Sequence, residues 1–280
     1  MTVAIIGLGL MGSSLALALN DIGFCKHLVG IDINPSFCKE ATALNIVNQI
    51  KELKEGVLIA DIIIVATPVG ASMDIITEVL DIVSENQVII DLGSTKKELC
   101  LHLNKHVNRK NYVAAHPIAG TENSGPKAAI THLYKNKKVV ICERNLSSDS
   151  ALTMAIEMFN KIGMSAVFMT PEEHDKHLAY ISHLSHISSF ALGLTVLDLE
   201  KDEKNIFNLA GSGFSSTARL AKSSPEMWNA IITQNKENVL PALEAYIHHL
   251  NDFRQDILKN NEEQLTAKMM EANNIRRIIK

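Results

Sequence analysis

Cysteine is scarce in this chain, and its scarcity excludes a fold built on disulfides. Four cysteines are scattered over 280 residues, and no two of them form a CxxC pair. This spacing does not indicate a thiol active site. We expect reduced thiols in a cytoplasmic protein.

An excess of positive charge is also missing. The formal net charge is −4, which gives no general attraction to nucleic acid or to an anionic membrane. Long apolar runs are absent as well. The run at residues 3–19 is broken by Gly7, Gly9 and Gly12, has no basic leader, and is shorter than the roughly 20 residues that cross a bilayer. We therefore expect no nucleic-acid partner, no membrane association and no secretion signal.

The chain does contain enough apolar residues, 46%, for a globular core. Up to about residue 169, short β-branched apolar runs alternate with helix-like stretches. Continuous apolar runs of this kind are typical of strands buried on both faces of a parallel sheet. They occupy residues 2–6, 28–31, 61–66, 87–91, 112–115 and 138–142. The alternation predicts a doubly wound α/β domain.

The pattern changes near residue 170. After a last apolar run at residues 166–169, Pro171 opens a region in which we predict only helices. The first is a long helix over residues 172–199, either continuous or interrupted. We therefore divide the chain into an α/β domain, residues 1–169, and an all-helical domain, residues 170–280.

One apolar stripe in the helical part points to a partner. Six residues recur at steps of three and four and share one helix face: Val239, Leu243, Tyr246, Leu250, Phe253 and Ile257. Such a stripe packs in a core or against a second subunit. We expect a homodimer formed through the helical domain.

A glycine-rich turn follows the first predicted strand. Gly7, Gly9 and Gly12 form the motif GxGxxG, with Leu10 and Met11 before the last glycine. The first glycine permits the tight turn, the second lets the backbone approach a pyrophosphate, and the third lets the helix pack against the strand. Unpaired N–H groups at the helix start attract phosphate. The motif therefore predicts a Rossmann-type dinucleotide site.

Asp32 indicates which dinucleotide binds. It ends the next predicted strand, where a carboxylate hydrogen-bonds the adenosine ribose hydroxyls and repels the extra phosphate of NADP. No arginine follows it in residues 33–37, so NAD is the predicted cofactor. Thr67 and Pro68 end another strand and are expected to line the same crevice.

Ser94 and His116 follow two further strands at the same predicted edge. An imidazole titrates near neutral pH and suits proton transfer, but a structural histidine fits the sequence equally well. Arg219 follows a glycine-rich break at residues 211–213. It is placed either to clamp a substrate carboxylate or to lie on the surface.

Two pairs of histidines fall in the first long helix. On an unbroken helix of about 100° per residue, His183 and His186 lie nearly opposite His174 and His177. Four such side chains cannot share one ion, so we predict no metal site. We expect His183 and His186 to line a substrate cleft, and His174 and His177 to lie on the solvated surface.

Together these segments resemble the prephenate dehydrogenase family, which includes arogenate and cyclohexadienyl dehydrogenases. The resemblance covers nearly the whole chain. Its most specific part is the run HPIAGTE that begins at His116, whereas the glycine motif is widespread. Residues 182–186 and 213–228 carry the resemblance into the helical domain.

The resemblance implies an NAD-dependent oxidative decarboxylation of prephenate to 4-hydroxyphenylpyruvate in tyrosine biosynthesis. His116 would accept the proton of the ring hydroxyl during hydride transfer, and Ser94 would hold that hydroxyl in register. Arg219 would pair with a substrate carboxylate. The same resemblance places further residues in the substrate pocket: His183, His186, Thr121 and Gly213.

Ser215 and Ser216 depart from the family pattern, because an arginine-aspartate pair often stands there. Three alternatives stay open from the sequence: an arogenate dehydrogenase, another two-domain hydroxyacid dehydrogenase, and an NAD-binding protein without chemistry. Turnover of prephenate or arogenate with NAD separates the first from the last, and a His116→Asn substitution tests the second.

Overall fold

The structure is a computed structural model and describes residues 1–201 and 209–277. The chain divides into two compact units, Met1–Asn235 and Lys236–Lys280, and the first unit contains the expected domain boundary near residue 169. Within the described residues, no helix combines the length and the apolar character that a membrane crossing needs.

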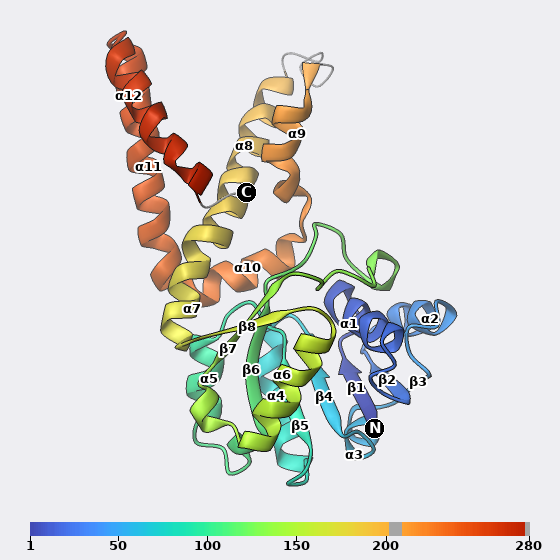
Figure 1. The fold of residues 1–280 in the computed structure, drawn as a ribbon. Helices are drawn as coiled ribbons and strands as arrows, with labels where there is room; N and C mark the ends of the chain where they lie inside the picture. The colour runs from blue at the N-terminus through green and yellow to red at the C-terminus, as the bar shows by residue number, and fades with distance from the viewer. Residues whose placement is uncertain (202–208, 278–280) are drawn as a thin grey trace. The chain divides into compact units, whose positions relative to one another are not determined.

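The first unit is built on a sheet of eight strands in the order β3-β2-β1-β4-β5-β6-β7-β8 (Figure 1). All neighbouring strands are parallel except β6 and β7. The strands are β1 Thr2–Ile6, β2 His27–Ile31, β3 Gln49–Ile50, β4 Ile62–Val65, β5 Val88–Asp91, β6 Tyr112–Pro117, β7 Lys138–Cys142 and β8 Ser165–Met169. The predicted fold class is confirmed, and seven of these strands overlap the predicted runs. No residue pattern signals the two-residue strand β3 or the antiparallel turn of the chain at β7.

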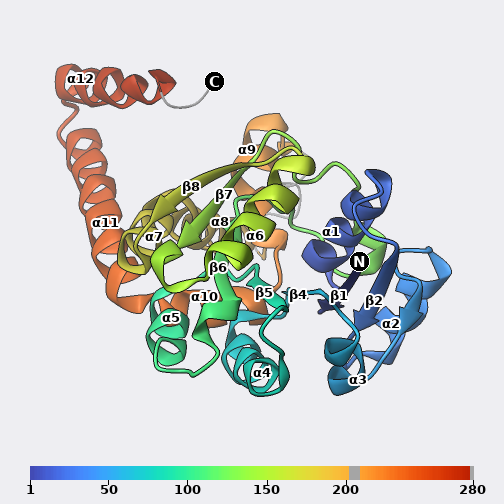
Figure 2. The ribbon, with the colours of Figure 1, turned by 60° about the horizontal axis from the view of Figure 1, so that its bottom comes forward.

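Helices cover both faces of the sheet, as Figure 2 shows with α6 above the strands and α4 below them. Alternate strand residues such as Ile5 and Ile64 face one core, and Ile63 and Val65 face the other. Full burial of one such side chain contributes about 1.5–3 kcal/mol. The first core is covered by α1 Leu10–Asp21, α2 Pro35–Ala43 and α6 Asp149–Lys161, and the second by α3 Leu53–Leu58, α4 Val69–Ile82 and α5 Lys97–Leu103.

The carboxyl ends of the parallel strands β1, β2, β4, β5 and β6 meet at one edge of the sheet. Strand order reverses between β1 and β4, and ligands of open α/β sheets bind in the crevice at such a point. The turns after these strands carry the predicted cofactor residues together with Ser94 and Thr121, whereas His183, His186, Gly213 and Arg219 lie in the helical stretches after β8. His116 lies within β6 itself, opposite Val140, and not in the loop after the strand.

A long helical stretch leaves the sheet after β8. It consists of α7 Pro171–Leu178, a π turn at Ala179–His183 and α8 Leu184–Glu200, and it agrees with the predicted helix over residues 172–199. Thr170 and Glu173 form a capping box at its start, with Pro171 in the first turn. The unit ends with α9 Ser212–Ala218, a 3-10 turn at Arg219–Lys222 and α10 Pro225–Gln234.

The second unit consists of α11 Lys236–Leu258, α12 Glu262–Ala272 and a 3-10 turn at Asn273–Arg277. Lys268 on α12 reaches Asp256 on α11 at 2.5 Å and ties the two helices. The predicted apolar stripe lies on α11, and it leaves Leu250 50% and Ile257 62% exposed.

Candidate active site

The turn after β1 has the shape that a dinucleotide requires. Gly7 has φ +95°, and a Cβ there would lie 2.6 Å from the carbonyl oxygen of Ala66. A Cβ at Gly12 would lie 2.0 Å from the oxygen of Gly7. By contrast, apart from Gly9 itself and its two chain neighbours, no atom of the described residues lies within 4 Å of a Cβ placed at Gly9. This glycine therefore faces open space beside the start of α1, where the amides of Leu10 and Met11 lie in the first turn.

Asp32 follows β2, at the same edge. Its Oδ2 accepts from the backbone N–H of Leu8 at 2.7 Å, and its Oδ1 accepts from that of Asn34 at 2.8 Å. These bonds hold the carboxylate rigidly beside the glycine turn. A carboxylate has about four lone-pair sites, so two hydroxyl donors of a ribose can still be accepted.

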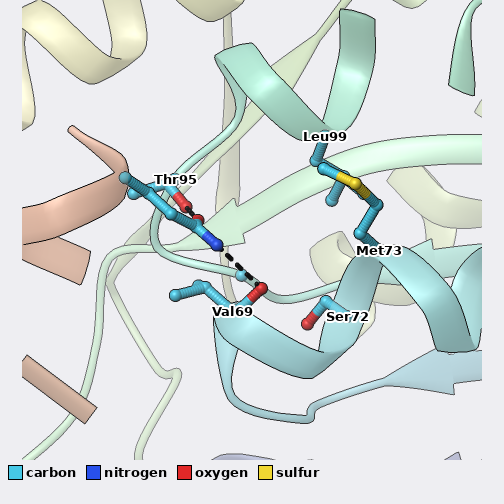
Figure 3. Close-up of a pocket in the computed structure, with 7 residues that line it drawn as sticks. Val69, Ser72, Met73, Thr95 and Leu99 are labelled. Carbon is cyan, nitrogen blue, oxygen red and sulfur yellow. Dashed lines mark hydrogen bonds between the residues drawn. The ribbon is translucent and has the colours of Figure 1, made fainter. Parts of the chain in front are cut away.

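The turns after β4 and β5 are tied to helix α10. Gln234 accepts from the Thr95 hydroxyl at 2.7 Å and donates to the carbonyl oxygen of Val69 at 3.1 Å. Figure 3 shows these bonds in a small recess that is also lined by Ser72, Met73, Gly93 and Leu99. Thr67 shares a 3.1 Å hydrogen bond with Ser72, and Pro68 caps the start of α4. Both predicted crevice residues therefore lie at the strand edge.

His116 is the first member of a buried chain of hydrogen-bonding groups. Its Nδ1 lies 2.8 Å from Nε2 of His174, and Nδ1 of His174 lies 2.7 Å from Oδ1 of Asp175. His174 is fully buried, so its predicted place on the solvated surface is wrong, whereas His177 is exposed as predicted. The prediction failed because α7 packs against α5 and β7, and His174 reaches His116 of the neighbouring strand β6.

Burial keeps the His116 imidazole neutral. Loss of hydration lowers its pKa well below the usual value, and the neighbouring His174, Lys96 and His183 lower it further. Burial also lowers the pKa of His174, against the opposing effect of the hydrogen bond that His174 donates to Asp175. Burial alone would raise the pKa of Asp175, but the hydrogen bonds from His174 and from the Lys97 and Lys96 amides bring it below its usual value. At neutral pH a neutral His116 can accept a proton.

Ser94 lies in a turn that rests on a buried ion pair. Lys96 Nζ donates to Asp91 Oδ2 and, at 2.8 Å, to the carbonyl oxygen of Gly93. The Tyr112 hydroxyl donates to Asp91 Oδ1 at 2.7 Å. Sequence reasoning missed this triad, although a lysine and an aspartate that flank a strand-end turn are a usable signal. Because Asp91, Lys96 and Tyr112 are fully buried, they fix the backbone on both sides of the half-buried Ser94.

The π turn changes the direction of the second histidine pair. One extra residue in a helical turn rotates the side chains after it by about 100°. His183 is consequently buried on the side of His174: its Nδ1 lies 3.1 Å from Nδ2 of Asn235, which donates to the carbonyl oxygen of Asp175 at 2.7 Å. The predicted opposite placement of the two pairs therefore fails for His174 and His183. His186 is half-buried and stacks on Trp228, with ring centroids 3.4 Å apart.

Arg219 lies in the 3-10 turn after α9, and its Nη1 contacts Oε2 of Glu122 at 2.7 Å. Backbone hydrogen bonding and this arginine lower the pKa of Glu122. Thr121 stands next to Glu122 in the loop after β6, so the ion pair brings that loop to Arg219. Gly213 lies in α9, where its carbonyl oxygen accepts from Ser216 and Thr217. In the part of the chain that the structure describes, no hydrogen bond links Gly213 to His116.

Metal ligation has no geometric basis in residues 1–201 and 209–277, where no three His, Cys, Asp or Glu side chains converge suitably. The four cysteines are free and do not pair with one another. The chemistry that the geometry of the described site supports is proton transfer at His116 beside a dinucleotide crevice.

Comparisons with known proteins agree with this geometry. Residues 15–168 match the family description "Prephenate dehydrogenase, nucleotide-binding domain", and residues 170–271 match "Prephenate dehydrogenase, dimerization domain". The prephenate dehydrogenase of Bacillus subtilis is 29% identical over 94% of this chain and 72% of its own length. The cyclohexadienyl dehydrogenase of Zymomonas mobilis is 29% identical over 99% of this chain and 96% of its own length.

Solved structures show the same similarity. A prephenate dehydrogenase from A. aeolicus in complex with hydroxyphenyl propionate and NAD+ has a TM-score of 0.90 and 32% identity, covering 100% of this chain and 98% of its own. The arogenate dehydrogenase of Synechocystis has a TM-score of 0.77 and 26% identity, covering the whole of both chains.

Proposed function

Since the chain belongs to the prephenate dehydrogenase family and is an NAD-dependent dehydrogenase, we propose that it converts prephenate to 4-hydroxyphenylpyruvate in tyrosine biosynthesis. The observation that carries this proposal is the neutral, buried His116 at the carboxyl end of β6, linked to His174. The role of His116 is to accept the ring-hydroxyl proton.

The residues of the first turn fit NAD. Open space at Gly9 admits the pyrophosphate, the amides that begin α1 bind it, and Asp32 accepts the ribose hydroxyls. Bound there, NAD supplies the hydride acceptor. Thr67 and Pro68 line the crevice farther along the same edge.

His116 accepts one proton and returns it during the reaction. The hydroxyl O–H bond breaks and its proton passes to Nε2, as hydride leaves the same carbon and a carbonyl forms. The ring carboxylate then departs as CO₂, its bonding electrons make the ring aromatic, and the oxygen takes the proton back from His116. Ser94 holds the hydroxyl beside the imidazole, and correct orientation is the main contribution of both residues.

The substrate is a dianion, and Arg219 is the proposed partner of one carboxylate. It already binds a carboxylate, that of Glu122, and a guanidinium matches such a group with two parallel N–H donors. The remaining proposed pocket residues are His183, His186, Thr121 and Gly213. Of these, the half-buried His186 stacked on Trp228 offers the best placed polar edge.

The test is NADH formation, followed by absorbance, with prephenate or arogenate and with NAD or NADP. We expect turnover of prephenate with NAD and a loss of at least a hundredfold in kcat for His116→Asn. Arogenate is the second candidate substrate, supported by the similarity to the Synechocystis enzyme. Faster turnover of arogenate would replace prephenate as the substrate. Undiminished hydride transfer by His116→Asn would favour another two-domain hydroxyacid dehydrogenase.

We further propose a homodimer formed through residues 170–280, with residues 1–169 as the NAD-binding domain, in the cytoplasm. The matched dimerization-domain description and the exposed apolar residues of α11 support the dimer. Light scattering tests it, and a monomer at micromolar concentration would contradict it.

A further inference from the structure

We propose that His174 and Asp175 are positioning residues that hold the His116 ring in the tautomer with a proton on Nδ1 and a free lone pair on Nε2. The structural basis is the chain of contacts from Asp175 Oδ1 through both nitrogens of His174 to His116 Nδ1, at 2.7 Å and 2.8 Å. The expected effects on turnover rest on the proposed function, whereas the tautomer of His116 does not.

The direction of each hydrogen bond follows from Asp175. Its Oδ1 also accepts from the Lys96 amide at 2.8 Å, and its Oδ2 accepts from the Lys97 amide at 2.9 Å. A carboxylate in such a set of donors is an acceptor only, so Nδ1 of His174 must donate to it. A neutral imidazole carries one proton, which leaves Nε2 of His174 as an acceptor. Nδ1 of His116 must then donate, and its Nε2 carries the lone pair.

The surroundings of His174 and Asp175 suit a positioning role. His174 is fully buried and Asp175 is 3% exposed, so water does not compete for their hydrogen bonds. Nε2 of His116 has no hydrogen-bond partner among the described residues and is available to a substrate. The other titratable groups that act on His116, Lys96 and His183, make no hydrogen bond to it that would set its tautomer.

Asp175 positions Ser94 as well. The two amides that it binds belong to Lys96 and Lys97, which begin α5 directly after the Ser94–Thr95 turn. One carboxylate on α7 therefore sets both the ring of His116 and the backbone of the turn that carries the second proposed catalytic group. In this way α7, the helix after β8, contributes to the site although it lies outside the sheet.

A pair of substitutions at His174 separates the two hydrogen bonds. The amide nitrogen of asparagine overlies Nδ1, so His174→Asn keeps the donor to Asp175 and loses the contact with His116. The amide oxygen of glutamine reaches the place of Nε2, so His174→Gln keeps an acceptor for His116. We expect kcat for the glutamine variant within about tenfold of the wild type, and a loss of about a hundredfold or more for the asparagine variant, with KM for NAD unchanged in both.

The pH profile adds a readout that a purely structural role would not move. In His174→Asn the His116 ring is free to take either tautomer, and we expect the acidic limb of kcat/KM to shift in that variant and to stay in place in His174→Gln. Circular dichroism melts check that both variants fold. Wild-type kcat in His174→Asn, or equal losses in the two variants, would overturn the inference.

A measurement without substrate separates this inference from the proposed function. In protein labelled with ¹⁵N-histidine, we expect the His116 signals to show a protonated Nδ1 and a bare Nε2, assigned by their loss in His116→Asn. A protonated Nε2 in the wild type would overturn the inference even if prephenate is turned over. The expected tautomer in a protein that turns over neither prephenate nor arogenate would uphold the inference and reject the proposed function alone.

Discussion

The glycines in the turn after β1 differ in their roles: some are needed for folding, and one is proposed to serve cofactor binding. Gly7 and Gly12 are required by the protein's own backbone, since a Cβ at either would collide with a carbonyl oxygen at 2.6 Å or 2.0 Å. Gly9 meets no such contact, and the open space beside it is where we propose that the pyrophosphate of NAD approaches.

We therefore predict opposite outcomes for two alanine substitutions. Gly9→Ala should keep the melting temperature within about 2 °C and weaken NAD binding at least tenfold, because its methyl group fills the space of the pyrophosphate. Gly12→Ala should lower the melting temperature strongly, because the backbone must move. Calorimetry of unfolding and of NAD binding measures both, and unchanged NAD affinity in Gly9→Ala would contradict the assigned site.

Arg219 gives a second prediction at this scale. A hydrogen bond to a charged group is worth about 1.5–3 kcal/mol, so Arg219→Gln should raise KM for prephenate by about 10- to 100-fold. KM for NAD should stay unchanged, because Arg219 reaches Glu122 and not the glycine turn. Lys222→Gln removes a nearby exposed positive charge and serves as the matched control, with KM changed less than about threefold. An equal rise in KM for prephenate in the two variants would show that Arg219 contributes only a general positive charge and does not bind the substrate carboxylate.

At the scale of elements, hydrophobic pattern and turn residues were enough to predict most of the architecture. The strands β1 and β7 have the predicted bounds, and the helix predicted over residues 172–199 is found as α7 Pro171–Leu178, the π turn Ala179–His183 and α8 Leu184–Glu200. Apolar runs and Pro171 are local signals, which a sequence carries directly. β3 was missed because two residues are too few to show a period.

The site was predicted only where position follows from a strand end. Asp32, Ser94 and His116 were placed at the correct edge for that reason. His174 was not, because its burial depends on α5 and β7, which are distant in sequence. The directions of His183 and His186 were derived from a regular helical rotation of about 100° per residue. No residue pattern indicates the π turn that interrupts this regular rotation.

The π turn itself can be tested by deletion. Ile181 is 70% exposed and contributes little packing, so its removal should convert the turn to a regular α-turn and rotate His183 by about 100° relative to α7. We expect kcat/KM to fall at least a hundredfold, with the helical circular dichroism signal retained. Ile181→Ala keeps the turn and should keep the activity. A fully active deletion variant would show that the direction of His183 is irrelevant to turnover.

At the scale of the whole molecule, the buried histidines make the fold sensitive to acid. Burial lowers the pKa of His116, of His174 and, to about 4, of His183. In the unfolded chain each would titrate near 6.5. Between these values the unfolded state binds protons that the folded state refuses, so the free energy of unfolding rises with pH and falls on acidification.

Acid lability should therefore begin near pH 6.5, well above the range in which carboxylates titrate. For His183 alone the difference between about 6.5 and about 4 corresponds to a loss on the order of 3 kcal/mol by pH 4. Asp175 and Glu122 have lowered pKa values, so their contributions are lost only as the pH falls from the usual carboxylate pKa values toward the lowered ones. Urea unfolding midpoints at intervals from pH 7.5 to 5 measure the slope. His183→Gln should reduce the pH dependence of the free energy of unfolding by the equivalent of up to one bound proton. A midpoint independent of pH between 7.5 and 5 would show that the buried histidines can take up protons without unfolding the protein.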